Sequence, residues 1–286
     1  MPAFTDKLTE TTPVTSIEDN MDESLLGMGR GPQVLLHQDE ELACLLTGVP
    51  FAPFNQVFRA RIPRPHVDSR VTEMTELFSS RGLRALWPVG PSSQPDDLCV
   101  HLERKGWTHG GDSIGMWLDL AKIQEPMPTG QDLDIRVVDD VRDMERWAEV
   151  AFPPNLVGAC SELLTSLGFA FPWRHYLCLE GGRAVACSQL FFGAGVAGIY
   201  LVRTVPDARR QGIGTALTLR TLLDASDMGC RFAVLTSSPM GEAVYRRLGF
   251  SDSCRIAIYE SPLSGGNDGQ AVLTTMCQGC RSQAGA

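Results

Sequence analysis

The sequence predicts an α/β protein with a mixed sheet, built from two related halves in tandem. Three observations favour this fold class. Strand-like and helix-like segments alternate along residues 133–261. A strand, a turn rich in Ser and Pro, a short helix, a Gly with an aromatic residue and a further strand occur once in each half. Two closely spaced glycines also stand where a strand passes into a helix.

Length, composition and charge set the class of protein. With 286 residues, two domains are a better expectation than one. A hydrophobic fraction of 43% and a charged fraction of 21% are typical of soluble globular proteins, and a formal net charge of −9 argues against nucleic-acid binding through phosphates. No apolar run is long enough to cross a bilayer, and residues 1–20 are acidic and polar rather than signal-like. We therefore expect a cytoplasmic protein without a membrane partner, as a monomer or homodimer.

Changes in composition predict the domain boundaries. Residues 1–25 have few large apolar side chains and are expected to form a flexible arm. Residues 26–122 are expected to be a first domain and residues 133–262 a second. Residues 123–132, with prolines, a glycine and charges, are the expected linker, and residues 263–286 are expected to be a flexible tail.

The second domain has the clearer succession of elements. Helical spacing of apolar residues predicts the helices, and short β-rich runs predict the strands. Gly229 suits the end of the long helix that follows the two glycines. In order, we expect a strand at 133–138, helices at 144–152 and 161–169, strands at 175–182, 183–193 and 197–205, a helix at 214–229, a strand at 231–237, a helix at 240–250 and a strand at 253–261.

The first half repeats the end of this succession. A strand is expected at 55–62 and a helix at 67–82, followed by a strand at Leu86 and a short helix that ends at Gly106. Gly106 and Trp107 then correspond to Gly249 and Phe250. A duplicated unit is the economical explanation of this correspondence.

The stretch VPDARRQGIGTAL, residues 205–217, carries the strongest functional signal. Backbone amides at a helix start bind anions, and glycines let a phosphate approach closely. A P-loop requires a lysine after its last glycine, but Thr215 and Ala216 follow Gly214. A dinucleotide fingerprint requires a third glycine where Leu217 stands. Both of these alternatives fail on the residues present.

The pattern R-x-x-G-x-G at Arg209–Gly214 resembles motif A of the GNAT superfamily of N-acetyltransferases. Ser237 and Ser238 after the next strand, and MGEAVYRRLGF with Tyr245 four residues before Gly249, are similar to the family's motif B. The resemblance covers residues 134–260. It implies two GNAT-like acyl-CoA N-acyltransferase folds in tandem and acetyl-CoA as co-substrate.

The resemblance also implies roles for individual residues. The backbone of the strand before the loop would pair with the pantetheine arm, and the amides of the loop would bind the pyrophosphate. Tyr245 would be the catalytic proton donor to the departing thiolate, because a phenol pKa of about 10 is close to a thiol pKa of about 8.5. The cofactor-binding residues implied are Val202, Arg203, Thr204, Arg209, Arg210, Gln211, Gly212, Ile213, Gly214, Thr215 and Ser238.

Two side chains in this half remain open to alternative interpretations. The general base is not readable, because Glu162, His175 and Glu242 all lie in the second half and their spacing selects none of them. Arg203 interrupts an apolar strand. It either points into the acceptor cleft toward a substrate carboxylate, or snorkels outward or pairs with a structural acid, and the second interpretation is favoured.

The first half lacks the residues of such a site. The connection before the helix at 67–82 reads PRPH, without glycine, and Leu102 occupies the position that corresponds to Tyr245. We therefore expect a degenerate GNAT-like domain that shapes the acceptor site or packs on its partner half.

The sequence thus predicts an N-acetyltransferase that moves acetyl from acetyl-CoA to a primary amine of a small molecule or peptide, by direct attack in a ternary complex. Alternatives are a non-catalytic acyl-CoA sensor or scaffold, and transfer of a longer acyl group or transfer to a protein amine. The nine cysteines are expected to be reduced, and the lone C-x-x-C at Cys277 and Cys280 is weak evidence for a metal, so no metal is expected.

Overall fold

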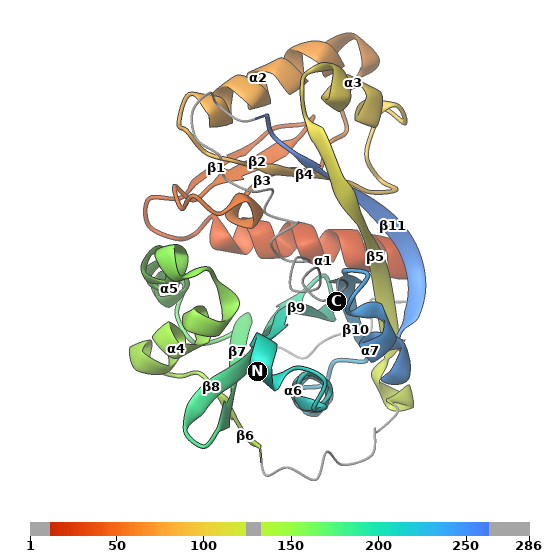
Figure 1. Ribbon diagram of the computed structural model, residues 1–286. Helices are drawn as coiled ribbons and strands as arrows, with labels where there is room; N and C mark the ends of the chain where they lie inside the picture. Colours follow the sequence, from red (N-terminus) through yellow and green to blue (C-terminus); the bar gives the residue numbers. More distant parts are fainter. Residues whose placement is uncertain (1–11, 124–132, 263–286) are drawn as a thin grey trace, which may run out of the picture. The chain divides into compact units, whose positions relative to one another are not determined.

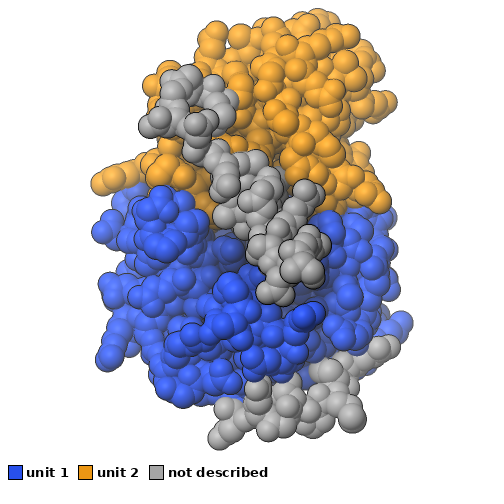
Figure 2. All heavy atoms as spheres, viewed as in Figure 1, with its two compact units in different colours: residues 1–32, 114–254 blue, residues 33–113, 255–286 orange. Residues whose placement is uncertain are grey.

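The computed structural model describes residues 12–123 and 133–262. The chain divides into two compact units, which Figure 2 shows in different colours. Unit 1 comprises residues 1–32 and 114–254, and unit 2 comprises residues 33–113 and 255–286. All of the predicted linker at 123–132 except residue 123, and the predicted tail at 263–286 with Cys277 and Cys280, lie outside the described residues. No helix in the described part is long and apolar enough to cross a membrane.

Unit 1 contains a mixed sheet with helices on both faces (Figure 1). Its strand order is β5-β10-β9-β8-β7-β6. The strands are β5 (Thr108–Asp119), β6 (Asp134–Val137), β7 (Trp173–Glu180), β8 (Arg183–Gly193), β9 (Val196–Thr204) and β10 (Phe232–Ser237). The helices are α1 (Pro13–Met28), α4 (Val141–Ala151), α5 (Val157–Ser166), α6 (Ile213–Asp227) and α7 (Glu242–Arg247).

The two faces of this sheet carry different helices. Trp147 of α4 packs edge-on against His175 of β7, at 5.0 Å between ring centroids, and α1 contacts Trp173 on the same face of β7. The intervening Arg174 pairs with Asp224 of α6 on the opposite face. Because successive strand residues point to opposite faces, α1 and α4 cover one side and α6 covers the other.

Local sequence fixes where the helices of unit 1 begin. Asp140 caps α4 by accepting a hydrogen bond from the Asp143 amide at 2.7 Å. Thr12 does the same for α1 through the Thr15 amide, and Pro13 occupies the first helical turn, where its missing N–H costs nothing. Gly212 begins α6 from a left-handed conformation, with φ +83°.

Unit 2 contains a smaller sheet in the order β1-β2-β3-β4-β11. Its strands are β1 (Leu35–Gln38), β2 (Ala43–Leu46), β3 (Asn55–Phe58), β4 (Leu86–Val89) and β11 (Ser251–Glu260), and its helices are α2 (Val67–Ser79) and α3 (Leu98–Arg104). Apolar residues of α2 and α3 form one core with Trp87 and Trp107, whose rings meet edge-on at 5.4 Å. Unit 2 thus has its own hydrophobic core.

The last strand of each sequence half belongs to the unit formed mainly by the other half. Residues 114–119 of β5 belong to unit 1, where they pair antiparallel with β10. Residues 255–260 of β11 belong to unit 2, where Ala257 to Glu260 pair antiparallel with β4. The predicted division into residues 26–122 and 133–262 therefore differs from the observed units, because strand pairing between distant segments leaves no mark on local composition.

The predicted duplication recurs in the hydrogen bonds. After α3, the Trp107 amide donates to the Leu102 carbonyl at 3.0 Å. After α7, the Phe250 amide donates to the Tyr245 carbonyl at 3.1 Å. Gly106 and Gly249 precede these aromatic residues with φ +86° and +101°. Both glycines are needed because the chain turns through the left-handed region.

The expected flexible arm at residues 1–25 is wrong for its described part, because Pro13–Met28 form helix α1. Asn20 of this helix is fully buried. Its Nδ2 donates to the Gly193 carbonyl at 2.9 Å, and its Oδ1 accepts from the Tyr200 hydroxyl at 2.6 Å. The segment has few large apolar residues, so the sequence predicted that it would not pack. It packs nevertheless, in part through the hydrogen bonds of this buried amide.

Replacing Gly198 with alanine is expected to lower the free energy of unfolding by about 2 to 3 kcal/mol. An added Cβ at Gly198 would lie 1.9 Å from Asn20 Oδ1, so the Asn20 side-chain amide would be pushed away from its hydrogen-bond partners. Urea denaturation measures the effect. Gly158→Ala in α5 is the matched control, because an added Cβ there meets nothing within 4 Å and alanine favours a helix by up to about 1 kcal/mol. Equal stability of the two variants would contradict the packing role of Gly198.

Candidate functional site

The central feature of unit 1 is the divergence of two parallel strands. β9 and β10 pair only from Ala197 to Ile199 and from Ala233 to Leu235. Beyond Ile199, β9 continues to Thr204 along β8. The backbone of residues 200–204 is therefore open on the side that faced β10, which leaves donors and acceptors for another extended chain.

A bulge lies where the two strands part. Cys187 pairs with Arg203 and Gln189 with Tyr200, so Leu201 and Val202 together stand opposite Ser188. Leu201 has φ +49°, which is rare for a branched side chain. Because bulges bend a strand and often lie beside active sites, this one accounts for the divergence of β9.

The glycine loop connects this strand to α6. Pro206–Ala208 form a 3-10 turn, and both Arg210 and Gly212 have positive φ, at +62° and +83°. A Cβ added at Gly214 would lie 3.2 Å from Thr204 Oγ1, so glycine lets the helix start close to the strand end. The two glycines therefore do different work: Gly212 turns the chain and Gly214 allows the approach.

The start of α6 presents backbone amides. The first helical hydrogen bond runs from the Ala216 amide to the Gly212 carbonyl at 2.9 Å. The amides of Gly212, Ile213, Gly214 and Thr215 precede it and have no acceptor within the helix. Together with the helix dipole, they favour an anion at this end.

Three polar side chains of the loop have defined positions. Arg209 Nε donates to the Thr204 carbonyl at 3.0 Å, which ties the loop to the end of β9. Gln211 Nε2 donates to the Asp207 carbonyl at 3.2 Å. Arg210 is exposed. The loop thus carries two guanidinium groups in the residues just before α6, one held against β9 and one exposed, and their positive charge suits a phosphate.

Tyr245 of α7 lies beside the end of β10. A Cβ added at Gly241 would lie 2.9 Å from Tyr245 Cε2 and 3.1 Å from Ser237 Oγ, so the ring edge lies close to the last residue of β10. Burial raises the pKa of Tyr245 to about 12. The phenol pKa is therefore further above the thiol pKa of about 8.5 than the sequence argument assumed, so Tyr245 is a weaker acid toward the thiolate. Its hydroxyl stays protonated at any ordinary pH.

The turn after β10 is built by backbone contacts. The Ser238 carbonyl accepts from the Gly241 amide at 2.9 Å and from Ser237 Oγ at 2.8 Å. Ser238 itself is exposed. Gly241, whose missing Cβ leaves room for the Tyr245 ring, did not emerge from the sequence, although its place before an aromatic helix residue was visible there.

The structure selects no general base among the three acids and bases considered. His175 is buried, with its Nε2 at 2.8 Å from Gln189 Nε2, and burial lowers its pKa to about 3. Glu242 pairs with Arg246 at 2.9 Å. Glu162 is exposed on α5. None of them combines a free basic atom with a place at the strand divergence.

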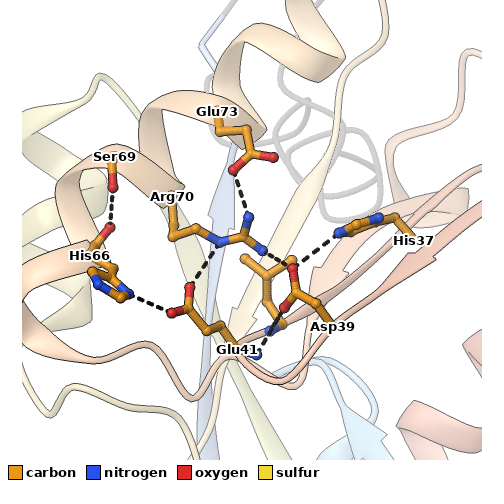
Figure 3. A network of polar contacts seen from close by, with 8 residues as sticks. His37, Asp39, Glu41, His66, Ser69, Arg70 and Glu73 are labelled. Atoms are coloured by element: carbon orange, nitrogen blue, oxygen red, sulfur yellow. Dashed lines mark hydrogen bonds and ion pairs between the residues drawn. The ribbon is translucent and has the colours of Figure 1, made fainter.

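In unit 2, the position that corresponds to the glycine loop is the start of α2, and carboxylates of the same unit lie there. Figure 3 shows Arg70 of α2 in ion pairs with Asp39, Glu41 and Glu73, and His66, at the start of α2, bonded to Glu41 at 2.6 Å. Although burial opposes the shift, hydrogen bonds from the Leu42 and Glu41 amides, with His37 and Arg70, hold the pKa of Asp39 at about 2. These negative charges disfavour a pyrophosphate at this helix start.

Other expectations from the sequence can be placed in the structure. Leu102 is fully buried in the core of unit 2. The seven cysteines in the described residues are free thiols. Within residues 12–123 and 133–262, no group of three His, Cys, Asp or Glu side chains could hold a metal ion.

The segment that carries the strand divergence and the glycine loop is similar to a known protein family. Residues 172–252 match the model of the acetyltransferase (GNAT) domain, which spans β7 to α7 with the first two residues of β11 and includes both motifs. No curated protein matches the chain in sequence. The match thus covers the strand divergence, the glycine loop and Tyr245.

Solved structures similar to the chain share its fold over nearly the whole length. A GCN5-related N-acetyltransferase from Kribbella flavida has a TM-score of 0.64 at 18% identity, covering 86% of this chain and 95% of that one. A tandem GNAT protein from the clavulanic acid biosynthesis pathway has a TM-score of 0.57 at 16% identity, covering 93% and 98%. A GCN5-related N-acetyltransferase from Sphaerobacter thermophilus has a TM-score of 0.53 at 16% identity, covering 90% and 96%.

Proposed function

We propose that the protein, an acyltransferase whose residues 172–252 form an acetyltransferase (GNAT) domain within a tandem GNAT fold, transfers acetyl from acetyl-CoA to the primary amine of a small molecule. The observation that carries this proposal is the coincidence of the β9–β10 divergence with the glycine-led start of α6. An extended pantetheine arm and its pyrophosphate need these two features side by side.

The roles of the cofactor residues follow from their places. The exposed backbone edge of Val202 to Thr204 pairs with the pantetheine arm as an added strand would. The amides from Arg210 to Thr215 bind the pyrophosphate, with Arg209 holding the loop against β9. Ser238, on the exposed turn after β10, contacts the pantetheine from the other side of the divergence.

The transfer itself needs little further machinery. The free amine attacks the thioester carbonyl, which a backbone N–H near Val202 polarises, and the tetrahedral intermediate then expels coenzyme A as a thiolate. Tyr245 donates a hydrogen bond and then a proton to the departing sulfur. With a phenol pKa of about 12, this proton transfer is unfavourable until the phenolate regains a proton from the amine or water.

Calorimetric titration of the full chain with acetyl-CoA is expected to show saturable binding at one site per chain. Unit 2 is expected to contribute no second site, because Asp39, Glu41 and Glu73 meet at Arg70 in the first turn of α2 and leave an excess of negative charge there. Thiol release from acetyl-CoA is then expected to require an added amine. Binding without turnover on any amine would favour the sensor alternative, whereas no binding by folded protein would overturn the proposal.

A further inference from the structure

Arg203 lies in the strand that defines the site, yet the cofactor does not account for its side chain. It occupies β9 next to Val202 and pairs across the strands with Cys187. Its Nη1 donates to the carbonyl of Ala151, the last residue of α4. The side chain is therefore on the face of the sheet that α1 and α4 cover.

This face is opposite to that of the cofactor loop. The neighbouring Thr204 side chain lies close to Gly214 at the start of α6. Because side chains alternate along a strand, Arg203 points away from α6 and from the amides proposed to hold the pyrophosphate. A phosphate of the cofactor at the α6 start is thus on the wrong side of β9 for this guanidinium.

Arg203 also lacks a counterion among the described residues. The structure contains ion pairs for Arg146 with Asp143 and for Arg174 with Asp224, but none joins Arg203 to a carboxylate of residues 12–123 or 133–262. A guanidinium stays protonated at physiological pH, and a half-buried charge without a partner is costly. The interpretation favoured from the sequence was that Arg203 snorkels outward or pairs with a structural acid; the described residues contain no such acid, and the bond to the Ala151 carbonyl holds the side chain against α4.

A second positive charge strengthens this local field. Burial is the main cause that lowers the pKa of Arg203, and the charge of Arg209 lowers it further. Arg209 is fixed by its bond to the Thr204 carbonyl. Because Arg209 is already held on the cofactor side of β9, its charge adds to the cost of leaving Arg203 without an anion on the other face.

We propose that Arg203 binds a carboxylate of the acceptor, so that the acceptor is a small primary amine that also carries a carboxylate. This inference rests on the proposed acetyl transfer. A guanidinium has five N–H donors, of which the Ala151 carbonyl takes one, and the remaining edge can hold a carboxylate with two parallel hydrogen bonds. The amine is proposed to attack a thioester carbonyl held near Val202, and successive strand residues are about 3.3 Å apart. The amine and the carboxylate that binds Arg203 must therefore be separated by only a few bonds.

The test compares matched acceptors on the full chain. The probes are the natural L-amino acids, their carboxamides and simple diamines, with acetyl-CoA as donor and thiol release as the readout. The wild type is expected to prefer the best amino acid over its carboxamide by about 100-fold in kcat/KM. Arg203→Gln is expected to abolish that preference through KM, whereas Arg203→Lys restores part of it.

Controls separate this role from a structural one. Arg142→Gln removes the same charge from an exposed site on α4 and is expected to keep the wild-type preference. Arg203→Gln is expected to lower kcat/KM far more for amino acids than for neutral amines, because only the backbone of Arg203, and not its side chain, is proposed to pair with the pantetheine arm. If the cofactor affinity falls instead, the side chain serves the cofactor and the inference is overturned.

The outcomes also separate this inference from the proposed function. Efficient acetylation of neutral or cationic amines, with no preference for carboxylates, would overturn the role of Arg203 and leave acetyl transfer intact. An equal preference in the wild type and in Arg203→Gln would do the same. Acetyl-CoA binding without turnover of any acceptor would overturn both.

Discussion

Combining Gly212→Ala with Gly214→Val is expected to weaken acetyl-CoA binding by at least about 100-fold. Gly212 adopts φ +83°, which costs alanine about 1 to 2 kcal/mol, and a side chain at position 214 would press on Thr204 and crowd the amides proposed to bind the pyrophosphate. Isothermal titration of wild type and variant with acetyl-CoA measures the loss.

Gly229→Ala provides the matched control for this double variant. Gly229 follows the opposite end of α6 and also has a positive φ, at +89°, with open space around an added Cβ. It imposes similar backbone strain on the same helix but lies far along the chain from the loop. Wild-type affinity in this control and in a folded Gly212→Ala, Gly214→Val protein would show that the loop does not bind the pyrophosphate.

Tyr245→Phe is expected to lower kcat by about 100-fold or more while the Kd for acetyl-CoA stays unchanged, because general acid catalysis contributes about 10² to 10⁴. Since burial raises the pKa of Tyr245 to about 12, its proton is retained as the pH rises, and the wild-type rate is expected to show no loss from this group below about pH 11. Pre-steady-state and steady-state thiol release across pH measure both effects.

A second tyrosine controls for the loss of a phenol hydroxyl. Tyr259 donates to Glu103 at 3.0 Å within unit 2, so Tyr259→Phe removes a phenol hydroxyl that is already engaged by a side chain of its own unit. Its kcat is expected to equal that of the wild type. A Tyr245→Phe enzyme with unchanged kcat would exclude Tyr245 as the proton donor and direct the search to water.

The sequence predicted those parts of the fold that local patterns encode. The strands and helices from β6 to β11 were all expected, because apolar periodicity and helix-ending glycines such as Gly229 act within a few residues. Helix α1 was missed because Asn20 meets partners near Gly193, far along the chain. The exchange of β5 and β11 was missed for the same reason, since pairing partners are not encoded in a strand's own composition.

The candidate site also has parts that local sequence predicted and parts that it could not predict. The glycine loop and Tyr245 belong to contiguous motifs, so their residues could be named from the sequence. The bulge at Leu201 depends on how β9 pairs with β8. That Arg203 has no carboxylate partner in the part of the chain that the structure describes depends on how the elements there pack around it. Such features follow from tertiary packing and become visible only in the folded chain.

The exchanged strands determine when each part of the protein can finish folding during synthesis. β4 lies early in the chain, but its partner β11 is made last, so unit 2 keeps an open sheet edge until Glu260 has left the ribosome. Neither half is then an autonomous folding module. A gene cut at the linker would yield two fragments whose sheets have unpaired edge strands, which are prone to aggregate. The first half cannot be lost in evolution without removing β5, which pairs with β10 in the sheet of unit 1.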